Sequence, residues 1–482
     1  AQDAAALEAW RIKYLGRKGS VTGLMRNIGK LPGEERPAYG QAANQLKVEL
    51  GDAYDGRKQA IAEKSLVSEL ASEGIELHEG YSPACMDPHP DLVVIGNALS
   101  RGNPAVEYVL DNDIDYVSGP RWLGENYLRG KTVIAITGTH GKTSTASMVA
   151  WILEQAGLAP GFLIGGIPAN FGISARDGEK VFVVEADEYD TAFFDKRAKL
   201  VHYRPLIATL NNLEFDHADI YPDIKAIQTQ FHHFVRTIPG KGTIVSNGSD
   251  ARLETVLGMG CWSSLERFSE ADGADWQVQR VQPDGSELEF RRHGQSVGRV
   301  RWGQIGQHNA MNACAALGAA VAAGVEPGQA VRALESFKGV KRRMELIHEG
   351  GGVRVYSDFA HHPTAIRLTL EGLRRNASNA RILVGMEPRS NTMRSGAHAQ
   401  ELAPALTPAD RVWVLTGEGI DWDPVEVLAP LEGAGRVVLR SDDMLEQMLD
   451  SVRPGDHVVF MSNGGFDDVP ARFCEALRDR DR

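Results

Sequence analysis

Short apolar runs rich in β-branched residues recur through most of this 482-residue chain, and most end in polar residues and precede stretches with helical spacing. The runs are DLVVIGNA, IDYVSG, KTVIAIT, KVFVVEAD, LIATLNN, VRVYSD, ARILVGME, RVWVLTG and DHVVFMSN. Short continuous apolar runs are typical of strands buried on both faces, as in parallel sheets covered by helices. The sequence therefore predicts an α/β fold, in which ligands bind at the carboxyl ends of the strands.

The length of the chain predicts several domains, because single hydrophobic cores rarely grow beyond about 250–300 residues. No apolar run approaches the roughly 18–20 residues that a membrane-spanning helix needs. The four cysteines are scattered without a CxxC pair, which suits a reducing compartment. We therefore expect a cytoplasmic protein.

Residues 1–64 differ from the rest of the chain in charge. They hold 11 Lys and Arg against 8 Asp and Glu, a net charge of +3, whereas the whole chain has a net charge of -12. Apolar residues at helical spacing on either side of KLPGEERPAYG predict an antiparallel α-helical hairpin. A solvated helical face explains the positive charge better than an anion-binding site does.

The string GTHGKTS follows the predicted strand TVIAIT and opens a predicted helix. Glycines let backbone N–H groups curl around phosphate oxygens, and the new helix presents its positive N-terminal end. Lys142 can neutralise terminal phosphates, and the Thr143 hydroxyl can join a Mg2+ shell. An ordinary strand–helix turn is the alternative, but the flanking elements favour a phosphate site made of Gly138, Thr139, His140, Gly141, Lys142, Thr143 and Ser144.

Acidic residues close the next predicted strand, KVFVVEAD. An acid at a strand tip beside a phosphate loop commonly holds the metal that bridges two phosphates, so we predict that Glu185 is a metal ligand. The same reasoning leaves Asp187, Glu188 and Asp190 undecided. His217, in NNLEFDHADIY, lies among carboxylates and amides where a second metal or the acceptor group would lie, with a capping role as the alternative.

Later stretches supply polar residues at helix starts and strand ends. In GQHNAMN, His308, Asn309 and Asn312 suit adenine, although Asn at a helix start is also a common cap. Arginine with Ser and Asn at strand ends suits the planar carboxylates of a substrate, and a surface loop is the alternative for each stretch. These candidates are Arg343, Asp358, His361, Arg389, Ser390, Asn391, Ser462 and Asn463.

The stretches GTHGKTSTASM, EADEYDTAFFDKR, NNLEFDHADIYPD, FHHFVRTIPG, GQHNAMN, DFAHHPTA, EPRSNTM and MSNGGF together resemble the ATP-dependent muramate peptide ligases of bacterial cell-wall metabolism. The resemblance runs from about residue 66 to the C-terminus. It implies a Rossmann-like domain that binds UDP, a central P-loop ATPase domain with a parallel sheet, and a C-terminal Rossmann-like domain for the incoming peptide. We expect these domains at 65–128, 129–340 and 341–482.

The resemblance also implies an amide-bond ligase of peptidoglycan recycling that joins UDP-N-acetylmuramate to the tripeptide L-alanyl-γ-D-glutamyl-meso-diaminopimelate, with ATP and Mg2+. By motif, Lys142, Glu185 and His217 are catalytic, and Thr143, Glu185 and His217 hold metal. His308, Asn309 and Asn312 face adenine, while Arg343 and Asp358 close over ATP. The implied substrate-binding residues are Asn170, Asn211, His361, Arg389, Ser390, Asn391, Ser462, Asn463 and Gly464.

Residues 1–64 depart from this family, because they lack the first strand and the glycine-rich loop that receive UDP. LEAWRIKYLGRKGSVTGLM and KLPGEERPAYGQAANQLKVEL instead resemble the N-terminal helical hairpin of the phenylalanyl-tRNA synthetase α subunit, which contacts tRNA in its own family. We therefore expect a truncated first Rossmann-like domain behind a chimeric N-terminus. A natural fusion, an engineered junction and a gene-model error are all compatible with this pattern.

Three functions stay open from the sequence. The chain is an active ligase, an ATP-binding protein with impaired UDP-sugar binding, or a non-enzymatic RNA-binding fusion. The phosphate, metal and adenine motifs favour the ligase. A charge of +3 on residues 1–64 supports RNA binding only weakly, since such binding rests on several phosphate contacts.

Overall fold

The computed structural model describes residues 73–377, 379–417 and 419–480, together with isolated positions between 10 and 70. The helical hairpin predicted for residues 1–64 lies outside the described residues. Residues 1–90 and 102–112 form one compact unit, and residues 91–101 and 113–482 form a second, larger one. Among the residues described, no helix is long and apolar enough to cross a membrane.

The described part of the smaller unit contains a short 3-10 helix, η2 (Pro83–Met86), and the helix α4 (Pro104–Asp111). α4 starts at a proline, whose fixed φ suits the first helical position. The Asn103 side chain caps the helix by accepting hydrogen bonds from the backbone N–H groups of Ala105 and Val106. Capping and the buried apolar side of α4 together explain why this short segment is helical.

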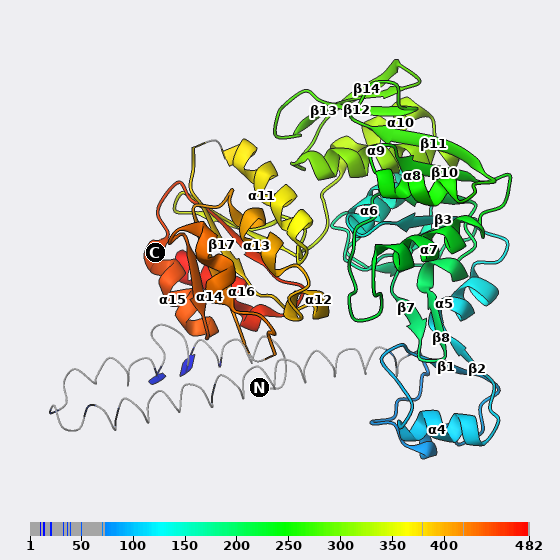
Figure 1. Ribbon diagram of the computed structural model, residues 1–482, viewed down its shortest axis with the longest axis horizontal. Helices are drawn as coiled ribbons and strands as arrows, with labels where there is room; N and C mark the ends of the chain where they lie inside the picture. The colour runs from blue at the N-terminus through cyan, green and yellow to red at the C-terminus, as the bar shows by residue number, and fades with distance from the viewer. Residues whose placement is uncertain are drawn as a thin grey trace. The chain divides into compact units, whose positions relative to one another are not determined.

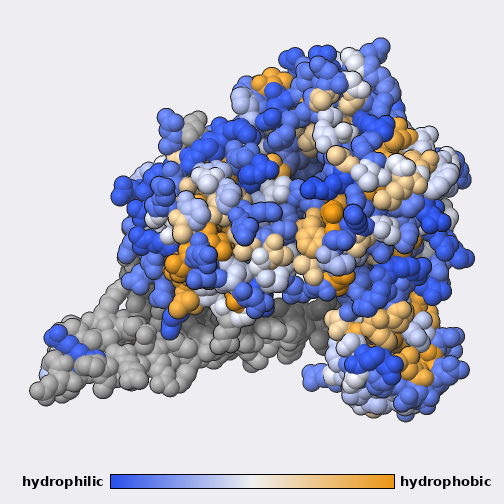
Figure 2. Space-filling view, in the orientation of Figure 1, coloured by the Kyte–Doolittle hydropathy of each residue, from blue (hydrophilic) through white to orange (hydrophobic). Residues whose placement is uncertain are grey.

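The larger unit begins with a two-stranded parallel sheet, β1 (Val93–Ile95) and β2 (Tyr116–Ser118). These strands come from the predicted runs DLVVIGNA and IDYVSG, and they are the only strands among the described residues before Thr132. Leu92 and Val94 are 43% and 51% exposed. Hydrophobic residues gather at the surface of this part of the chain in Figure 2. A Rossmann-like sheet normally has more strands than this pair.

The central sheet has ten strands in the order β14-β13-β12-β11-β10-β9-β3-β6-β4-β5. In Figure 1, β11, β12, β13 and β14 lie together at the top of the view. Neighbouring strands from β4 to β12 are parallel, whereas β5 at one edge and β13 and β14 at the other pair antiparallel. The strands are β3 (Thr132–Thr137), β4 (Gly161–Leu163), β5 (Ala175–Arg176), β6 (Val181–Glu185), β9 (Ile207–Leu210), β10 (Thr243–Asn247), β11 (Ser264–Ser269), β12 (Trp276–Arg280), β13 (Glu287–Arg292) and β14 (Gln295–Arg301).

Helices cover both faces of this sheet. Ile134 and Ile136 of β3 pack against α6 and α9, whereas Val133 and Ala135 of the same strand pack with α7 and α8. This alternation is the two-residue period of a strand, and burial on both faces explains the continuous apolar run. The helices are α6 (Lys142–Gln155), α7 (Ile224–Val235), α8 (Ala251–Gly258), α9 (Gln307–Ala322) and α10 (Pro327–Ala333), and a separate hairpin pairs β7 (Asp190–Ala192) with β8 (Asp195–Ala198).

The last part of the chain forms a six-stranded sheet in the order β15-β16-β20-β17-β18-β19, parallel except for β15. Val384 of β17 packs on the side of α11 and α13, and Leu383 packs on the side of α15 and α16. The elements are β15 (Glu345–Gly350), β16 (Val353–Asp358), α11 (Pro363–Ala377), β17 (Ile382–Met386), α12 (Asn391–Arg394), α13 (Ala399–Leu406), β18 (Arg411–Leu415), α14 (Pro424–Leu428), β19 (Gly435–Val438), α15 (Ser441–Ser451), β20 (His457–Met461) and α16 (Val469–Arg480).

The predicted α/β class, with parallel sheets covered by helices, is confirmed. Each of the nine predicted runs contains a strand of the structure. The phosphate loop, the Glu185 tip and the NNLEFDH stretch follow β3, β6 and β9, which are neighbours in the central sheet. Their carboxyl ends therefore bring these three polar segments to one edge.

Candidate active site

Residues 138–141 form a tight loop between β3 and α6. Gly138 and Gly141 have φ angles of 135° and 78°, which residues with a side chain rarely adopt. A Cβ on Gly141 would lie 2.3 Å from Asn312 Oδ1, and a Cβ on Gly138 would lie 2.9 Å from the Cβ of Asn211. Because no side chain caps α6, the N–H groups of its first turn can meet an anion. The loop has the geometry of a phosphate site.

A hydroxyl and a carboxylate meet where α6 begins and β6 ends. Thr143 Oγ1 donates a hydrogen bond of 3.0 Å to Glu185 Oε1. The backbone N–H of Gly165 donates to Glu185 Oε2 at 2.8 Å, and Arg343 Nη2 donates to Thr143 Oγ1 at 3.3 Å. Oxygen ligands of these two kinds are the ones Mg2+ prefers, so the residues present fit that ion.

Lys142 is ion-paired with a buried acid beside the loop. Its Nζ lies 2.8 Å from Glu188 Oε2 and donates to the Gly138 carbonyl oxygen at 2.7 Å. Burial disfavours the ammonium, but the charges of Glu188 and Asp187 hold the pKa of Lys142 above its usual value. Lys142 therefore stays positively charged.

His217 lies on the other side of the same acid. Its Nε2 is 3.5 Å from Glu188 Oε1, and ligand atoms of Asp187, Glu188 and His217 all lie within 4.8 Å of one another. His217 has a φ of 56°, in the left-handed region that few residues with a side chain adopt. This second cluster fits another divalent cation, and it includes two acids that the sequence left undecided.

A cavity of ≈ 690 Å³ extends from the phosphate loop to α9 and to residues beyond 340. Its volume lies in the range of small-molecule and cofactor sites. It brings together predicted residues from distant parts of the chain, namely His140, Gly141, Thr143, Ser144, Asn211, His308, Asn309, Asn312, Arg343 and Asp358. Gly138, Thr139 and Lys142 do not line this cavity, although they belong to the same loop.

His308 is a buried polar group of this cavity. Burial lowers the pKa of its imidazole to about 4, so the ring is neutral at neutral pH. Its Nδ1 is buried without a hydrogen-bond partner, and so is the Oδ1 of Asn211. Buried polar atoms are normally paired, so these two atoms fit a ligand rich in donors and acceptors, such as a nucleotide. Asn309 instead donates to the Ile305 carbonyl oxygen at 2.8 Å.

A second cavity, of ≈ 440 Å³, lies at the carboxyl ends of β17 and β18 and contains Arg389. Ser462 Oγ donates to Glu387 Oε2 at 2.6 Å, which joins two strand ends beside this cavity. A Cβ on Gly464 would lie 2.2 Å from the Cδ of Arg389, so the arginine side chain packs directly on this glycine. Asn463 Oδ1 is buried without a partner. The cavity presents charges of both signs, from Glu387, Arg389, Arg394, Arg440, Asp442 and Asp467.

Four predicted substrate residues are hydrogen-bonded within the protein and, like Ser462, Asn463 and Gly464, line neither of these two cavities. The Asn170 amide joins the backbone of Ser336 and Lys338, Ser390 caps α12, Asn391 donates to Asp219, and His361 Nδ1 contacts the Phe359 carbonyl oxygen. The sequence also offered His362 as a candidate polar residue, but it assigned no role to Glu214 and did not predict that both residues lie beside His140. All three residues lie in motifs used in the sequence analysis. They are far apart in the sequence, so no spacing within a motif indicates that they lie close together.

Comparisons with known proteins place most of the chain in one family. Residues 136–320 match the Mur ligase middle domain, residues 342–464 match the Mur ligase, glutamate ligase domain, and residues 43–130 match the Mur ligase family, catalytic domain. Residues 2–70 match the N-terminal domain of class II aminoacyl tRNA synthetases. Residues 43–70 therefore fall within two matches.

Individual relatives agree with this assignment. The UDP-N-acetylmuramate–L-alanyl-γ-D-glutamyl-meso-2,6-diaminoheptandioate ligase of Escherichia coli (strain K12) is 49% identical, over 85% of this chain and 89% of that protein. The ligase of the same name from Haemophilus influenzae is 46% identical, over 85% and 90%. The crystal structure of a murein peptide ligase from Psychrobacter arcticus 273-4 has a TM-score of 0.65 and 42% identity, covering 85% of this chain and 90% of that one.

The chain belongs to the Mur ligase family. The family and the ligase class predicted from the sequence motifs are confirmed. The synthetase-like character predicted for the front of the chain is confirmed as a match over residues 2–70.

Proposed function

We propose that this chain is an ATP-dependent ligase of peptidoglycan recycling that joins UDP-N-acetylmuramate to L-alanyl-γ-D-glutamyl-meso-diaminopimelate. The observation that carries the proposal is a phosphate loop whose Thr143 meets Glu185 at the wall of a nucleotide-sized cavity. Two relatives named for this substrate pair, at 49% and 46% identity, support the choice of substrates. We place the reaction in the cytoplasm, where the four cysteines, all free, stay reduced.

We assign one ligand to each predicted domain. UDP-N-acetylmuramate goes to residues 65–128, ATP to residues 129–340, and the peptide to residues 341–482. The phosphate loop and α9 support the second assignment, because both line the larger cavity. The charged cavity at the ends of β17 and β18 supports the third.

Within the ATP site, the loop N–H groups and Lys142 bind the terminal phosphates. Thr143 and Glu185 hold one Mg2+, and His217 with Glu188 holds a second near the acceptor carboxylate. When bound, these ions neutralise phosphate and carboxylate charge. His308, Asn309 and Asn312 face the adenine, and Arg343 and Asp358 approach the nucleotide from the following segment.

The reaction couples two displacements. A lactyl carboxylate oxygen of the muramate attacks the γ-phosphorus of ATP, the bond to the β–γ bridging oxygen breaks, and ADP leaves. The peptide ammonium loses a proton, the free amine attacks the carbonyl carbon of the acyl phosphate, and the nitrogen then loses a second proton. The tetrahedral intermediate then expels inorganic phosphate and leaves an amide. Lys142 is held where charge develops in the first step, and fixed charges of this kind stabilise transition states without reorganisation.

For the peptide, we assign binding to the residues around the second cavity. The guanidinium of Arg389 can pair with a peptide carboxylate, since Arg suits planar anions. The unpaired Oδ1 of Asn463 can accept from a peptide N–H or ammonium group. Arg389 and Ser462 each contact Glu387, and Gly464 lies against Arg389, which supports this assignment.

An assay of ADP release with each substrate omitted in turn tests the proposal. Full release should require UDP-N-acetylmuramate, the tripeptide and Mg2+ together, and Lys142→Ala should lower it by roughly 100- to 1,000-fold. ADP release at the same rate with and without the tripeptide would contradict the ligase function.

A second candidate is a ligase with impaired UDP-sugar binding, favoured by the two-stranded β1–β2 sheet. Calorimetry with each ligand alone distinguishes this candidate from the fully active ligase. Weak UDP-N-acetylmuramate binding beside strong ATP binding is expected if the first domain is truncated. Equally tight binding of both would show that the UDP pocket is complete. No finding supports a tRNA contact by residues 2–70.

A further inference from the structure

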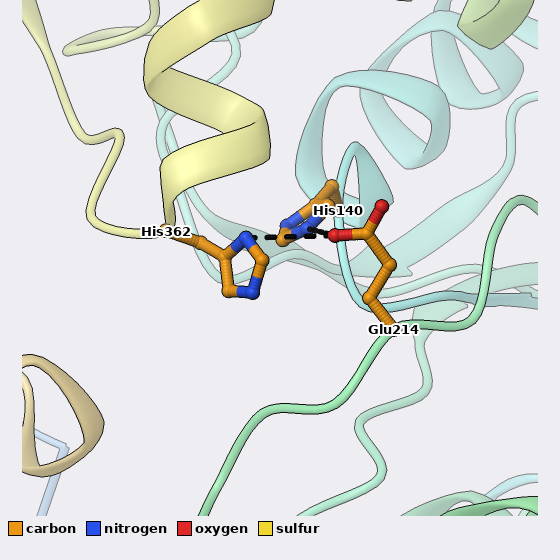
Figure 3. Close-up of side chains that lie close together, drawn as sticks. All are labelled: His140, Glu214 and His362. Carbon is orange, nitrogen blue, oxygen red and sulfur yellow. Dashed lines mark hydrogen bonds and ion pairs between the residues drawn. The ribbon is translucent and has the colours of Figure 1, made fainter. Parts of the chain in front are cut away.

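Three side chains that the proposed reaction does not use as metal ligands converge beside the nucleotide cavity (Figure 3). His140 lies in the phosphate loop, Glu214 follows β9, and His362 immediately precedes α11. His140 Nε2 lies 3.1 Å from Glu214 Oε2, and His362 Nδ1 lies 3.5 Å from the same oxygen. The carboxylate of Glu214 thus meets both imidazoles.

The hydrogen bonds of His362 determine which of its nitrogens carries a proton. Nε2 lies 3.3 Å from the carbonyl oxygen of Phe215, which can only accept, so Nε2 is the donor. Nδ1 accepts a hydrogen bond of 3.2 Å from the backbone N–H of Thr364. That bond uses the one lone pair of Nδ1, which lies 3.5 Å from Glu214 Oε2 in a nearly buried site, so a metal ion would replace the Thr364 N–H at this nitrogen.

The Glu214 carboxylate and the two imidazoles are electron-pair donors, so a cation among them would be held by three ligand atoms. In a tetrahedral site with ligand bonds of about 2.0–2.1 Å, neighbouring ligand atoms are about 3.3 Å apart. The two measured separations from Glu214 Oε2, 3.1 Å and 3.5 Å, bracket this value. The ligand atoms of all three residues lie within 4.8 Å of one another.

The donor set indicates the class of ion. Two imidazoles with one carboxylate suit Zn2+ and its first-row neighbours, whereas Mg2+ prefers oxygen ligands. An imidazole that donates its other N–H to a backbone carbonyl, as His362 does to Phe215, is the usual support for a metal ligand. His398 Nε2 also contacts this carbonyl, at 3.1 Å, which further fixes the segment.

We propose that His140, Glu214 and His362 bind a divalent transition-metal ion of the Zn2+ class, distinct from the Mg2+ ions assigned to the reaction. His140 and Glu214 line the nucleotide cavity, so the fourth coordination position is open toward it. The ion links the phosphate loop and the segment after β9 to the start of α11. It therefore holds together three segments that surround the nucleotide.

Co2+ is a suitable probe, because its visible absorption is strong in four- or five-coordinate sites and weak in octahedral sites. The full chain, stripped of metal and free of nucleotide, is titrated with Co2+ in a His217→Ala background, which removes the Asp187–Glu188–His217 cluster. We expect one Co2+ per chain with the strong absorption of four- or five-coordinate Co2+. Zn2+ should displace it.

Variants of the ligands complete the test. His362→Ala and Glu214→Gln should each weaken Co2+ binding at least about 100-fold and abolish the strong absorption. His361→Ala removes the neighbouring imidazole, which contacts the Phe359 carbonyl oxygen and is not in the cluster, so it should bind Co2+ like its parent. Thermal unfolding checks that each variant is folded. If His362→Ala does not fold, Co2+ binding by Glu214→Gln serves as the test. Unchanged binding in a folded ligand variant, or a weak octahedral spectrum in the parent, would overturn the proposal.

Discussion

The Nζ of Lys142 lies 2.8 Å from a carboxylate oxygen of the buried Glu188, at the mouth of the phosphate loop. The acid holds the ammonium where the phosphate loop would present a terminal phosphate. Because Glu188 raises the pKa of Lys142 against the effect of burial, the ammonium is charged across the working pH range. A preformed charge of this kind is what phosphoryl transfer requires.

Lys142→Ala should therefore lower kcat by roughly 100- to 1,000-fold, or about 3–4 kcal/mol of transition-state stabilisation. Steady-state ligation at saturating ATP measures the loss. Lys196→Ala is the matched control, because Lys196 also pairs with an acid, Asp190 at 2.7 Å, but is 70% exposed. The control should retain nearly full activity, and near wild-type turnover by Lys142→Ala would remove Lys142 from the mechanism.

Gly141→Ala should disrupt the phosphate loop. Gly141 has a φ of 78°, and a Cβ there would lie 2.3 Å from Asn312 Oδ1. Gly157, with a φ of 77°, has open space around its Cβ position, so Gly157→Ala isolates the backbone strain of about 1–2 kcal/mol. Urea denaturation and ATP calorimetry should show a larger stability loss and at least about tenfold weaker ATP binding for Gly141→Ala. Equal losses in both variants, with ATP binding intact, would contradict the packing argument.

His308 should make the free protein sensitive to mild acid. Burial, reinforced by the charge of Arg343, lowers its folded-state pKa to about 4, below an unfolded value of about 6.5. The unfolded chain therefore binds the proton first, so stability is full above about pH 6.5 and falls as the pH drops toward about 4. Between about pH 7.5 and about pH 5, wild-type protein should lose about 2 kcal/mol more unfolding free energy than His308→Gln. Parallel pH profiles of the two proteins in urea denaturation would show that His308 is not the cause.

Arg389→Ala and Asn463→Ala should act on the peptide and not on the nucleotide. Loss of a hydrogen bond to a charged group costs about 1.5–3 kcal/mol, so the tripeptide KM should rise at least about tenfold while the ATP KM stays constant. Arg375→Ala is the control, since Arg375 pairs with Glu371 at 3.2 Å on the surface of α11, and such pairs contribute little. A change confined to the ATP KM would reverse the assignment of the two cavities.

Strands buried on both faces could be predicted from the sequence, because their runs are continuous. The run KVFVVEAD contains β6, and the run RVWVLTG contains β18. The antiparallel edge could not be predicted in the same way. β13 contributes only Leu288 and Phe290 to the core, and its alternating charged residues make ion pairs, such as Glu289 with Arg299 at 2.8 Å. Such alternation is typical of a half-buried strand, but it lacks the continuous apolar run that marks the parallel strands.

The residues of the candidate site also fall into those that could be predicted from the sequence and those that could not. The phosphate loop could be predicted because its chemistry lies within consecutive residues. Glu188 could not be chosen over its acidic neighbours, because its burial depends on how the chain folds beyond β6. Its partner Lys142 is 46 positions away, and Glu214 is 74 positions from His140. Only the parallel order of β3, β6 and β9 brings these residues to one sheet edge.

Transfer of an oxygen label tests the proposed ligase mechanism most directly. UDP-N-acetylmuramate labelled with oxygen-18 in the lactyl carboxylate is incubated with ATP, Mg2+, the tripeptide and the full chain, and the released phosphate is analysed by mass spectrometry. The mechanism predicts one labelled oxygen in each phosphate formed, in step with the amide product, because the carboxylate oxygen that attacks ATP leaves with the phosphoryl group. Unlabelled phosphate would contradict the proposed function.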